Sequence, residues 1–336
     1  MLFIHQFPDW THFRFDNRRV LDALGKTRFE EGRLAGLLTF VNSKDLETGI
    51  IADDIVANFA IDGHALDLDD VTKELALRSQ AHTVHIRNYL GAIENSANPL
   101  TPERLFGWHS ALTGHKTPGY RETAYEVVSD DMRFAGPGPE RLQTEMGHFF
   151  DWFEKSPMDG TIKAAIAHFW FLTVSPFREG NGRLVRTITA LQLCRAQKTN
   201  HLPFSLNRQI LGNRDEYFRT LNKAQCGNGD LTDWILWFLS QIDTAIENRK
   251  IEIQSGIRHA TFMNKLTGTP TGEREQVLLE AALAGDIPRE FTAKDVAKVF
   301  GTSHDTALRE IQSLIKKGIV KANSKGGRSQ RYSLVE

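Results

Sequence analysis

One twelve-residue segment combines residue types that bind an anion. It reads Ser175-Pro176-Phe177-Arg178-Glu179-Gly180-Asn181-Gly182-Arg183-Leu184-Val185-Arg186. An apolar run predicts a buried helix before it, Pro176 prevents that helix from continuing, and Gly180-Asn181-Gly182 can adopt positive φ before a new helix begins. Such a turn directs several backbone N–H groups at one point beside a helix N-terminus, so the segment predicts an anion site.

Charged side chains around this turn indicate which anion it binds. Arg183 and Arg186 are three residues apart, so both guanidinium groups project from one face of the new helix. Glu179 could hold Mg²⁺ against the same phosphates. Together these groups describe a site for a nucleotide di- or triphosphate. The alternative is a plain glycine turn between two helices, with both arginines in solvent.

The segment resembles the signature of the Fic/Doc family, which reads His-Pro-Phe-x-Asp/Glu-Gly-Asn-Gly-Arg-x-x-Arg. Eleven of its twelve positions comply here. Four further stretches resemble one bacterial branch of the family, which has an N-terminal helical segment and a C-terminal winged helix: residues 8–16, 32–38, 103–112 and 167–174. The resemblance covers essentially the whole chain. It implies a mainly α fold whose helical core carries a short β-hairpin flap.

Members of this family transfer AMP from ATP to a side-chain hydroxyl of another protein, and the resemblance assigns a role to each part. It implies that Glu179 is the Mg²⁺ ligand and that Gly180–Gly182 surround the α- and β-phosphates. Arg183 would contact the β-phosphate and Arg186 the γ-phosphate. Phe177 would anchor the loop in the core. The implied cofactors are ATP and Mg²⁺, and the implied partner is an unknown target protein.

Ser175 is the one position that departs from the signature. The family's histidine is the general base on the attacking hydroxyl, and a serine hydroxyl cannot accept a proton near neutral pH. Loss of a general base typically costs about 10²–10⁴-fold in rate, while nucleotide binding is retained. His168 is seven residues earlier, too far along a helix to replace the base, and is predicted to be structural. Whether Ser175 is natural or engineered is left open.

Three functions are compatible with this departure. The first is a protein adenylyltransferase whose activity Ser175 lowers or redirects. The second is a catalytically silent, nucleotide-binding regulator that acts through its C-terminal domain. A phosphate-transferring relative of the Doc branch fits less well, because Gly-Asn-Gly-Arg is present rather than that branch's variant loop.

A second departure concerns an inhibitory motif, Ser/Thr-x-x-x-Glu-Gly/Asn, that many Fic proteins carry. Its glutamate pairs with the second arginine and obstructs the γ-phosphate. The matching stretch here has Asn58 for the hydroxyl residue, Asp62 for the glutamate, and Gly63. Because aspartate is one methylene shorter, we expect its pairing with Arg186 to be incomplete. The alternative is that Asp62 is an ordinary loop carboxylate.

The segment from about Gly119 to Phe134 predicts the flap. Apolar residues flank the polar triplet Ser129-Asp130-Asp131, which is typical of a β-hairpin. The resemblance implies that this hairpin aligns a target peptide by strand pairing. Tyr217 and Asn222 are candidates for lining the nucleotide-base pocket.

The rest of the chain predicts mainly helices in three segments. Residues 1–95 form an N-terminal helical segment with the inhibitory-like motif, 96–250 the Fic core, and 251–336 a linker helix and winged-helix domain. A long helical segment is expected from about Val71 to Ile93, and the apolar Thr161–Val174 predicts a helix buried on all sides.

The C-terminal segment predicts helix-turn-helix followed by two strands, Gly318–Ala322 and Gln330–Leu334, which resembles a winged helix. Residues 291–336 hold nine Lys/Arg and four Asp/Glu, a local net charge of +5. Lys325 and Arg328 in the loop add to the charge near the wing. This charge favours DNA, but winged helices also dock proteins or dimerise, so DNA, a protein and a homodimer partner all remain open.

Composition restricts the remaining function classes. The formal net charge is −1, so a basic surface must be local. The only cysteines, Cys194 and Cys226, form no CxxC pair, which argues against a disulfide framework or zinc site. The N-terminus lacks a signal peptide's apolar core, and no stretch approaches the ~18 apolar residues of a membrane span. We therefore expect a cytoplasmic protein with no membrane partner.

Overall fold

A computed structural model describes residues 2–39, 44–77, 83–129, 132–266, 269–323 and 330–335. Asp130 and Asp131 of the predicted hairpin turn lie outside the described residues, as does the loop 324–329 with Lys325 and Arg328. The chain divides into two compact units, Met1–Arg249 and Lys250–Glu336. The division of the chain at residues 95 and 250 stays a prediction.

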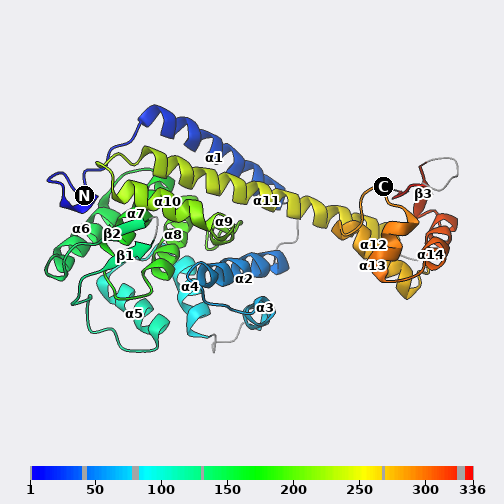
Figure 1. Cartoon of the computed structure of the whole chain (residues 1–336), viewed down its shortest axis with the longest axis horizontal. Helices are drawn as coiled ribbons and strands as arrows, with labels where there is room; N and C mark the ends of the chain where they lie inside the picture. Colours follow the sequence, from blue (N-terminus) through cyan, green and yellow to red (C-terminus); the bar gives the residue numbers. More distant parts are fainter. Residues whose placement is uncertain are drawn as a thin grey trace. The chain divides into compact units, whose positions relative to one another are not determined.

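The first unit is built almost entirely from helices, which confirms the predicted mainly α fold (Figure 1). Its α-helices in the described residues are α1 (Asn17–Leu38), α2 (Lys44–Ala60), α3 (Leu68–Ala76), α4 (Val84–Glu94), α5 (Pro102–Thr113), α6 (Leu142–Lys155), α7 (Gly160–Val174), α8 (Asn181–Gln197), α9 (Leu206–Gly212), α10 (Arg214–Gln225) and the first part of α11 (Thr232–Lys265). Short 3₁₀ turns lie at Ile4–Gln6 and Pro139–Arg141. Strands β1 (Glu126–Ser129) and β2 (Met132–Ala135) pair antiparallel, with Glu126 opposite Ala135.

Helix α7 forms the centre of the unit. Every residue from Thr161 to Val174 except Leu172 is buried, as the apolar pattern predicts. The helix packs most extensively against α8 and also against α6. The indole of Trp234 in α11 donates a 2.7 Å hydrogen bond to the Ala165 carbonyl of α7. Helix α7 is thereby held in a close-packed core, so the turn that follows Val174 starts from a rigid support.

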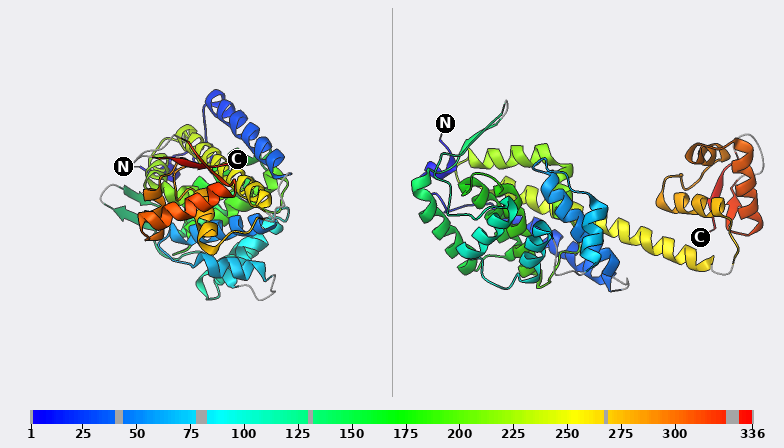
Figure 2. Two further views of the ribbon diagram at one scale, coloured as in Figure 1. Left: turned by 90° about the vertical axis from the view of Figure 1, so that its right-hand side faces the viewer. Right: turned by 90° about the horizontal axis from the view of Figure 1, so that it is seen from below.

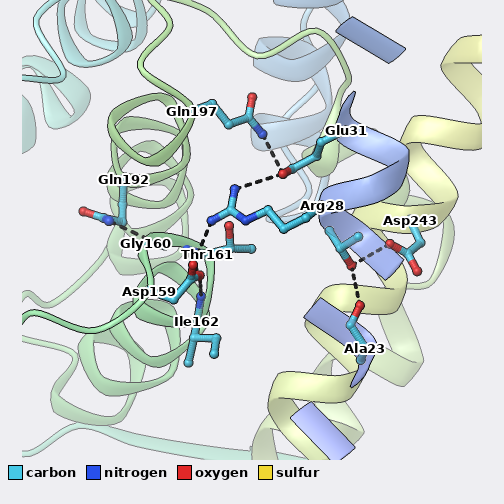
Figure 3. Close-up of polar contacts among 11 residues, drawn as sticks. Ala23, Arg28, Glu31, Asp159, Gly160, Thr161, Ile162, Gln192, Gln197 and Asp243 are labelled. Atoms are coloured by element: carbon cyan, nitrogen blue, oxygen red, sulfur yellow. Dashed lines mark hydrogen bonds and ion pairs between the residues drawn. The ribbon is translucent and has the colours of Figure 1, made fainter. Parts of the chain in front are cut away.

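Helix α1 is attached to this core by a polar network, drawn in Figure 3. Arg28 donates to Asp159 at 3.0 Å, and Asp159 also caps α7 by accepting from the Thr161 N–H. Gln197, the last residue of α8, donates to Glu31 at 2.8 Å. The N-terminal segment and the helices after it therefore belong to one compact unit.

The hairpin stands out from the helical body of this unit (Figure 2). The N-terminal segment packs on its second strand, since the rings of Phe3 and Phe134 lie edge to face at 5.2 Å. A ring nitrogen of His5 also hydrogen-bonds the Ala135 carbonyl at 2.7 Å. Strand β2 packs against α10 on another side. The hairpin is therefore supported at β2.

The predicted long helix from Val71 to Ile93 is wrong. Helix α3 ends with Leu77 as its C-cap, and α4 begins only after Thr83. Apolar spacing over such an interval does not distinguish one helix from two, because both place apolar residues on a buried face. Helix α9 was not predicted from the sequence, because its seven residues are too few to show the helical spacing of apolar residues.

The second unit has its own core. Its elements are the rest of α11, α12 (Glu273–Ala284), α13 (Ala293–Phe300), α14 (His304–Lys316), β3 (Val320–Ala322) and β4 (Tyr332–Leu334), the last two antiparallel. Thr292 and Ser303 are the N-caps of α13 and α14, because each side chain accepts a hydrogen bond from the backbone N–H three residues later. The helix-turn-helix and strand pair expected here are present, while the assignment to the winged-helix class stays a prediction. Within the described ranges, no helix is both long and apolar enough to cross a bilayer.

A buried carboxylate fixes helix α2 in the first unit. Asp54 accepts hydrogen bonds from the Tyr89 hydroxyl of α4, from the Ser205 hydroxyl at 2.7 Å, and from the Asn207 backbone and side chain at 2.9 and 2.7 Å. Burial raises the pKa of Asp54, and these donors oppose that effect. The contacts hold α2 to α4 and to the start of α9.

Removing this carboxylate should destabilise the first unit. Asp54→Ala leaves several buried donors without an acceptor, so the free energy of unfolding should fall by about 2–4 kcal/mol. Urea unfolding measures the loss. Asp53→Ala is the matched control, because its partly exposed ion pair with Arg208 is worth less than about 1 kcal/mol. Equal losses in the two variants would contradict the role given to Asp54.

Candidate functional site

The turn between α7 and α8 begins at Ser175. This residue is buried and takes a left-handed conformation, with φ 43° and ψ 67°. Its N–H donates to the Phe171 carbonyl at 2.8 Å, and its hydroxyl donates to the Leu172 carbonyl at 2.7 Å. A left-handed residue other than glycine costs about 1–2 kcal/mol, so surrounding contacts must hold the chain in this bend.

Phe177 and Asn181 brace the turn from inside. The Asn181 side chain accepts from the Phe177 N–H at 3.0 Å and donates to the Phe177 carbonyl at 2.8 Å. The buried Phe177 ring stacks on His109 with centroids 4.0 Å apart. His109 also hydrogen-bonds the Glu179 carbonyl at 3.2 Å. The amide side chain of Asn181 is thus used within the turn, so its contribution to an anion site would come from its backbone.

Both ends of the Gly-Asn-Gly triplet favour glycine, Gly180 through its backbone and Gly182 through its close neighbours. Gly180 is the N-cap of α8 with φ 78°, and an added Cβ would lie 2.8 Å from the Leu112 side chain. A Cβ on Gly182 would lie 2.9 Å from the Asp62 carboxylate and 3.0 Å from the Arg186 guanidinium. The first N–H groups of a helix have no acceptor within the helix, so these glycines allow a ligand to approach the N-terminus of α8.

Both arginines of the motif face the end of α2 rather than solvent. Arg186 is 2% exposed, and its guanidinium donates to the Asn58 side chain at 2.6 Å and to the Asn58 carbonyl at 2.7 Å. Asp62 lies 3.0 Å from the same guanidinium and 3.6 Å from Nε of Arg183. Arg183 also lies over the Phe59 ring at 5.3 Å. The alternative of two solvated arginines is therefore wrong.

The contacts of Asp62 answer a second question that the sequence leaves open. Asp62 is no isolated loop carboxylate, because it forms ion pairs with two arginines. It follows α2, and the next residue, Gly63, turns the chain with φ 82°. The shorter side chain still reaches Arg186. The involvement of Asn58 through both its side chain and its carbonyl has no counterpart in the sequence prediction.

These residues surround one pocket of about 320 Å³. The glycine turn, Glu179 and both arginines line it, together with Asp62 and His64 from the chain after α2, hairpin residues Val127, Met132 and Phe134, and α10 residues Tyr217, Phe218, Leu221, Asn222 and Gln225. Ser175 also lines the pocket, and Glu179 is exposed within it. The predicted base-pocket candidates Tyr217 and Asn222 are thus both in its wall. The hairpin, α8 and α10 that supply this wall lie together in Figure 1.

His168 lies deep in the core and is absent from the pocket wall. Its ring nitrogens hydrogen-bond the Thr189 hydroxyl at 2.9 Å and the Tyr217 hydroxyl at 2.8 Å. Burial, with a smaller effect from the Arg186 charge, lowers the pKa of His168 to about 3. A neutral, doubly bonded imidazole fits the structural role predicted for it. It ties α7 to α8 and α10.

Several residues around the site were missed by sequence reasoning. They are His64 in the pocket wall, His109 under Phe177, and Arg121 behind Ser175. His109 lies in a stretch that resembles the family, and Arg121 lies two residues after Gly119 at the start of the hairpin segment. The sequence around His109 and Arg121 does not indicate which backbone groups these side chains contact.

Comparisons with known proteins agree with this description. Residues 99–193 match the Fic/DOC family, and residues 3–78 match a domain of unknown function named DUF4172. The chain is 31% identical over 143 residues to a protein named protein adenylyltransferase Fic from Nematostella vectensis, and 28% identical over 118 residues to protein adenylyltransferase fic-1 from Caenorhabditis elegans. These matches cover 40% and 34% of the chain, and only 31% and 22% of the length of the two relatives.

Solved structures show the same fold. A Fic family protein from Desulfovibrio desulfuricans G20 superposes with a TM-score of 0.56 at 20% identity, covering 95% of this chain and 97% of that one. A fragment of Fic-1 from C. elegans gives a TM-score of 0.51 at 17% identity, covering 70% and 73%. The helical fold with its glycine turn at the start of α8 is the fold of these Fic structures. Residues 99–193 of the chain are a Fic/DOC family domain.

The buried imidazole should make stability depend on pH. The folded pKa of His168, about 3, lies below the usual 6.5, so its contribution is present above pH 6.5 and is lost as the pH falls towards 3. Between pH 6.5 and 5 the parent should lose about 2 kcal/mol more than His168→Gln. Urea unfolding across this range measures the difference. His115→Gln, at an exposed position, should keep the parent's pH dependence, and an identical slope in the His168 variant would contradict the assignment.

Proposed function

We propose that this chain has the architecture of a Fic-type protein adenylyltransferase, which binds ATP with Mg²⁺ and transfers AMP to a hydroxyl side chain of a target protein. In this proposal, Ser175 in place of the family's histidine lowers or abolishes the rate of AMP transfer. One observation carries it: the glycine turn, both motif arginines and the hairpin line a single pocket at the N-terminus of α8. The names of the N. vectensis and C. elegans relatives support the same activity.

The phosphates would bind at the N-terminus of α8. Backbone N–H groups of its first turn and the dipole of a 17-residue helix favour negative charge there. Arg183 and Arg186 supply two positive charges in the same wall. Since Asp62 already contacts both, the phosphates must displace it or share these cations with it. We propose that Asn58, Asp62 and Gly63 act as an inhibitory element for this reason.

Glu179 is the residue that would hold Mg²⁺. It lines the pocket beside Gly180, and its exposed carboxylate fits an ion that is bound by one carboxylate together with phosphate oxygens. Among the described residues no group of three or more His, Cys, Asp and Glu forms a metal cage. When bound, Mg²⁺ neutralises charge on the phosphate oxygens.

The transfer step needs a proton acceptor. The target's hydroxyl oxygen forms a bond to the α-phosphorus, the bond from that phosphorus to the bridging oxygen breaks, and pyrophosphate leaves. The hydroxyl proton must go to a base. Ser175 donates its own proton to the Leu172 carbonyl and cannot take up another near neutral pH. In this proposal the groups that would bind the phosphates are retained, and Ser175 itself supplies no base.

The β1–β2 hairpin would present the target chain. Val128 is 67% exposed and Val127 is 40% exposed on β1, whose partner on one side is β2. An extended target segment could pair with this strand through backbone hydrogen bonds, which do not depend on its sequence. The hairpin residues in the pocket wall bring such a segment near the nucleotide.

A second candidate function is favoured by Ser175 itself. Without a base, the nucleotide site would serve a catalytically silent regulator that signals through the unit Lys250–Glu336. The local charge of +5 over residues 291–336 suits DNA as the partner of that unit, and a docked protein or a second copy of this chain is the alternative. The two functions differ in what happens when a base is restored.

Restoring the histidine at position 175 distinguishes the transferase from the silent regulator. Ser175→His should raise transfer by about 10²–10⁴-fold, because it supplies the general base. The measurement is protein-bound label after incubation with α-labelled ATP, Mg²⁺ and a bacterial lysate. Ser175→Ala is the matched control and should equal the parent, since neither side chain is a base. If Ser175→His binds ATP but transfers no more label than the parent, the transferase proposal fails and the regulator is favoured.

Removing the Asp62 charge should strengthen nucleotide binding. Asp62→Asn takes a carboxylate away from both arginines, and the Kd for Mg·ATP should fall about tenfold. Calorimetric titration gives the Kd. Asp69→Asn makes the same charge change at an exposed position of α3 and should leave the Kd unchanged. Similar affinities for parent, Asp62→Asn and Asp69→Asn would show that Asp62 does not compete with the phosphates.

A further inference from the structure

Arg121 is a buried cation whose partners are backbone carbonyls. It is 7% exposed, and its guanidinium donates to four of them: Thr123 at 2.7 Å, Pro137 at 2.6 Å, Val174 at 3.3 Å and Ser175 at 2.8 Å. Its own backbone N–H donates to the Pro176 carbonyl at 2.9 Å. One residue thus touches three consecutive positions at the start of the turn.

These carbonyls come from segments that are distant in the sequence. Thr123 precedes strand β1, and Pro137 follows strand β2, so Arg121 contacts the chain on both sides of the hairpin. Val174 ends α7, and Ser175 is the left-handed residue after it. A guanidinium has five donors in a rigid plane, so it can hold several acceptors at fixed angles at once.

The hairpin end and the end of α7 approach closely at this point. A Cβ added to Gly136 would lie 3.3 Å from the Arg121 guanidinium and 3.4 Å from the Thr173 and Val174 carbonyls. The Arg121 guanidinium also lies 5.7 Å from the centre of the Tyr125 ring, just before β1. Burying a guanidinium is unfavourable, and burial lowers the pKa of Arg121. The four carbonyls offset this cost, because each accepts a hydrogen bond from the guanidinium.

We propose that Arg121 is a positioning residue that fixes both ends of the β1–β2 hairpin to the left-handed start of the α7–α8 turn. Its consequence for catalysis rests on the proposed function: a target segment on the hairpin and a nucleotide at the turn would be held at one mutual distance. The link itself is a property of the folded chain, and its test requires no nucleotide.

Arg121→Lys tests the link, because an ammonium keeps the charge but presents its donors from a single point. Amide hydrogen exchange of the full chain should rise about tenfold in residues 126–129 and 132–135, with α8 amides unchanged. Thermal unfolding of the same sample shows that the variant is folded. Unchanged exchange in the hairpin, or a uniform rise throughout the first unit, would overturn the proposal.

Arg104→Lys is the matched control. Arg104 in α5 also donates to backbone carbonyls, among them Asn98 at 2.9 Å and Gly91 at 3.1 Å, and stacks over Trp108 at 4.8 Å, but it does not contact the hairpin or the turn in the described structure. The same chemical change there should leave exchange in the hairpin at the parent's rate. A hairpin that loosens equally in both variants would reflect general destabilisation, and would count against positioning by Arg121.

A second readout separates positioning from support of the nucleotide site. In the Ser175→His background, Arg121→Lys should leave the Kd for Mg·ATP within about twofold and lower label transfer to lysate proteins about tenfold. Equal weakening of both would overturn the proposal. If Ser175→His binds no ATP, the proposed function fails, and the exchange measurement still decides the role of Arg121 because it uses the chain without ligand.

Discussion

The site depends on a buried guanidinium, that of Arg186. An uncompensated cation in the interior of a protein is strongly destabilising, so the chain must bring acceptors to it. The end of α2 does so with the side chain and carbonyl of Asn58 and with Asp62. Asp54, one turn earlier on α2, is in turn satisfied by donors from α4 and the start of α9. Polar groups at both points therefore determine where α2 lies.

This arrangement has a consequence for the proposed nucleotide site. The two Asn58 contacts orient Arg186 before any ligand arrives, so a phosphate would meet a cation that is already desolvated and aligned. Asp62 differs from Asn58 because it carries charge and lies in the pocket wall. In the proposed function, the residue that orients the arginine, Asn58 in α2, therefore differs from the residue that competes for it, Asp62 after α2.

Ser175 and Arg121 show how the turn combines a strained bend with a rigid support. The left-handed backbone at Ser175 is held by its N–H bond to Phe171 and by the Arg121 guanidinium on its carbonyl. Neither contact involves the Ser175 side chain, whose hydroxyl bonds the Leu172 carbonyl. These two backbone contacts do not require a serine at position 175, whereas the chemistry of the proposed function depends on the side chain there.

Features with a local cause were predictable from the sequence: α7 from its all-round apolar run, the turn from Pro176 and the glycines, and the hairpin from apolar residues around a polar triplet. Their positions follow from sterics and burial within a few residues. Tertiary structure decided three other features. They are the break between α3 and α4, the pairing of Arg186 with Asn58 across 128 residues, and the choice of carbonyls around Arg121. Buried polar groups take partners from wherever the fold brings them, and such pairings leave no period or motif in the chain.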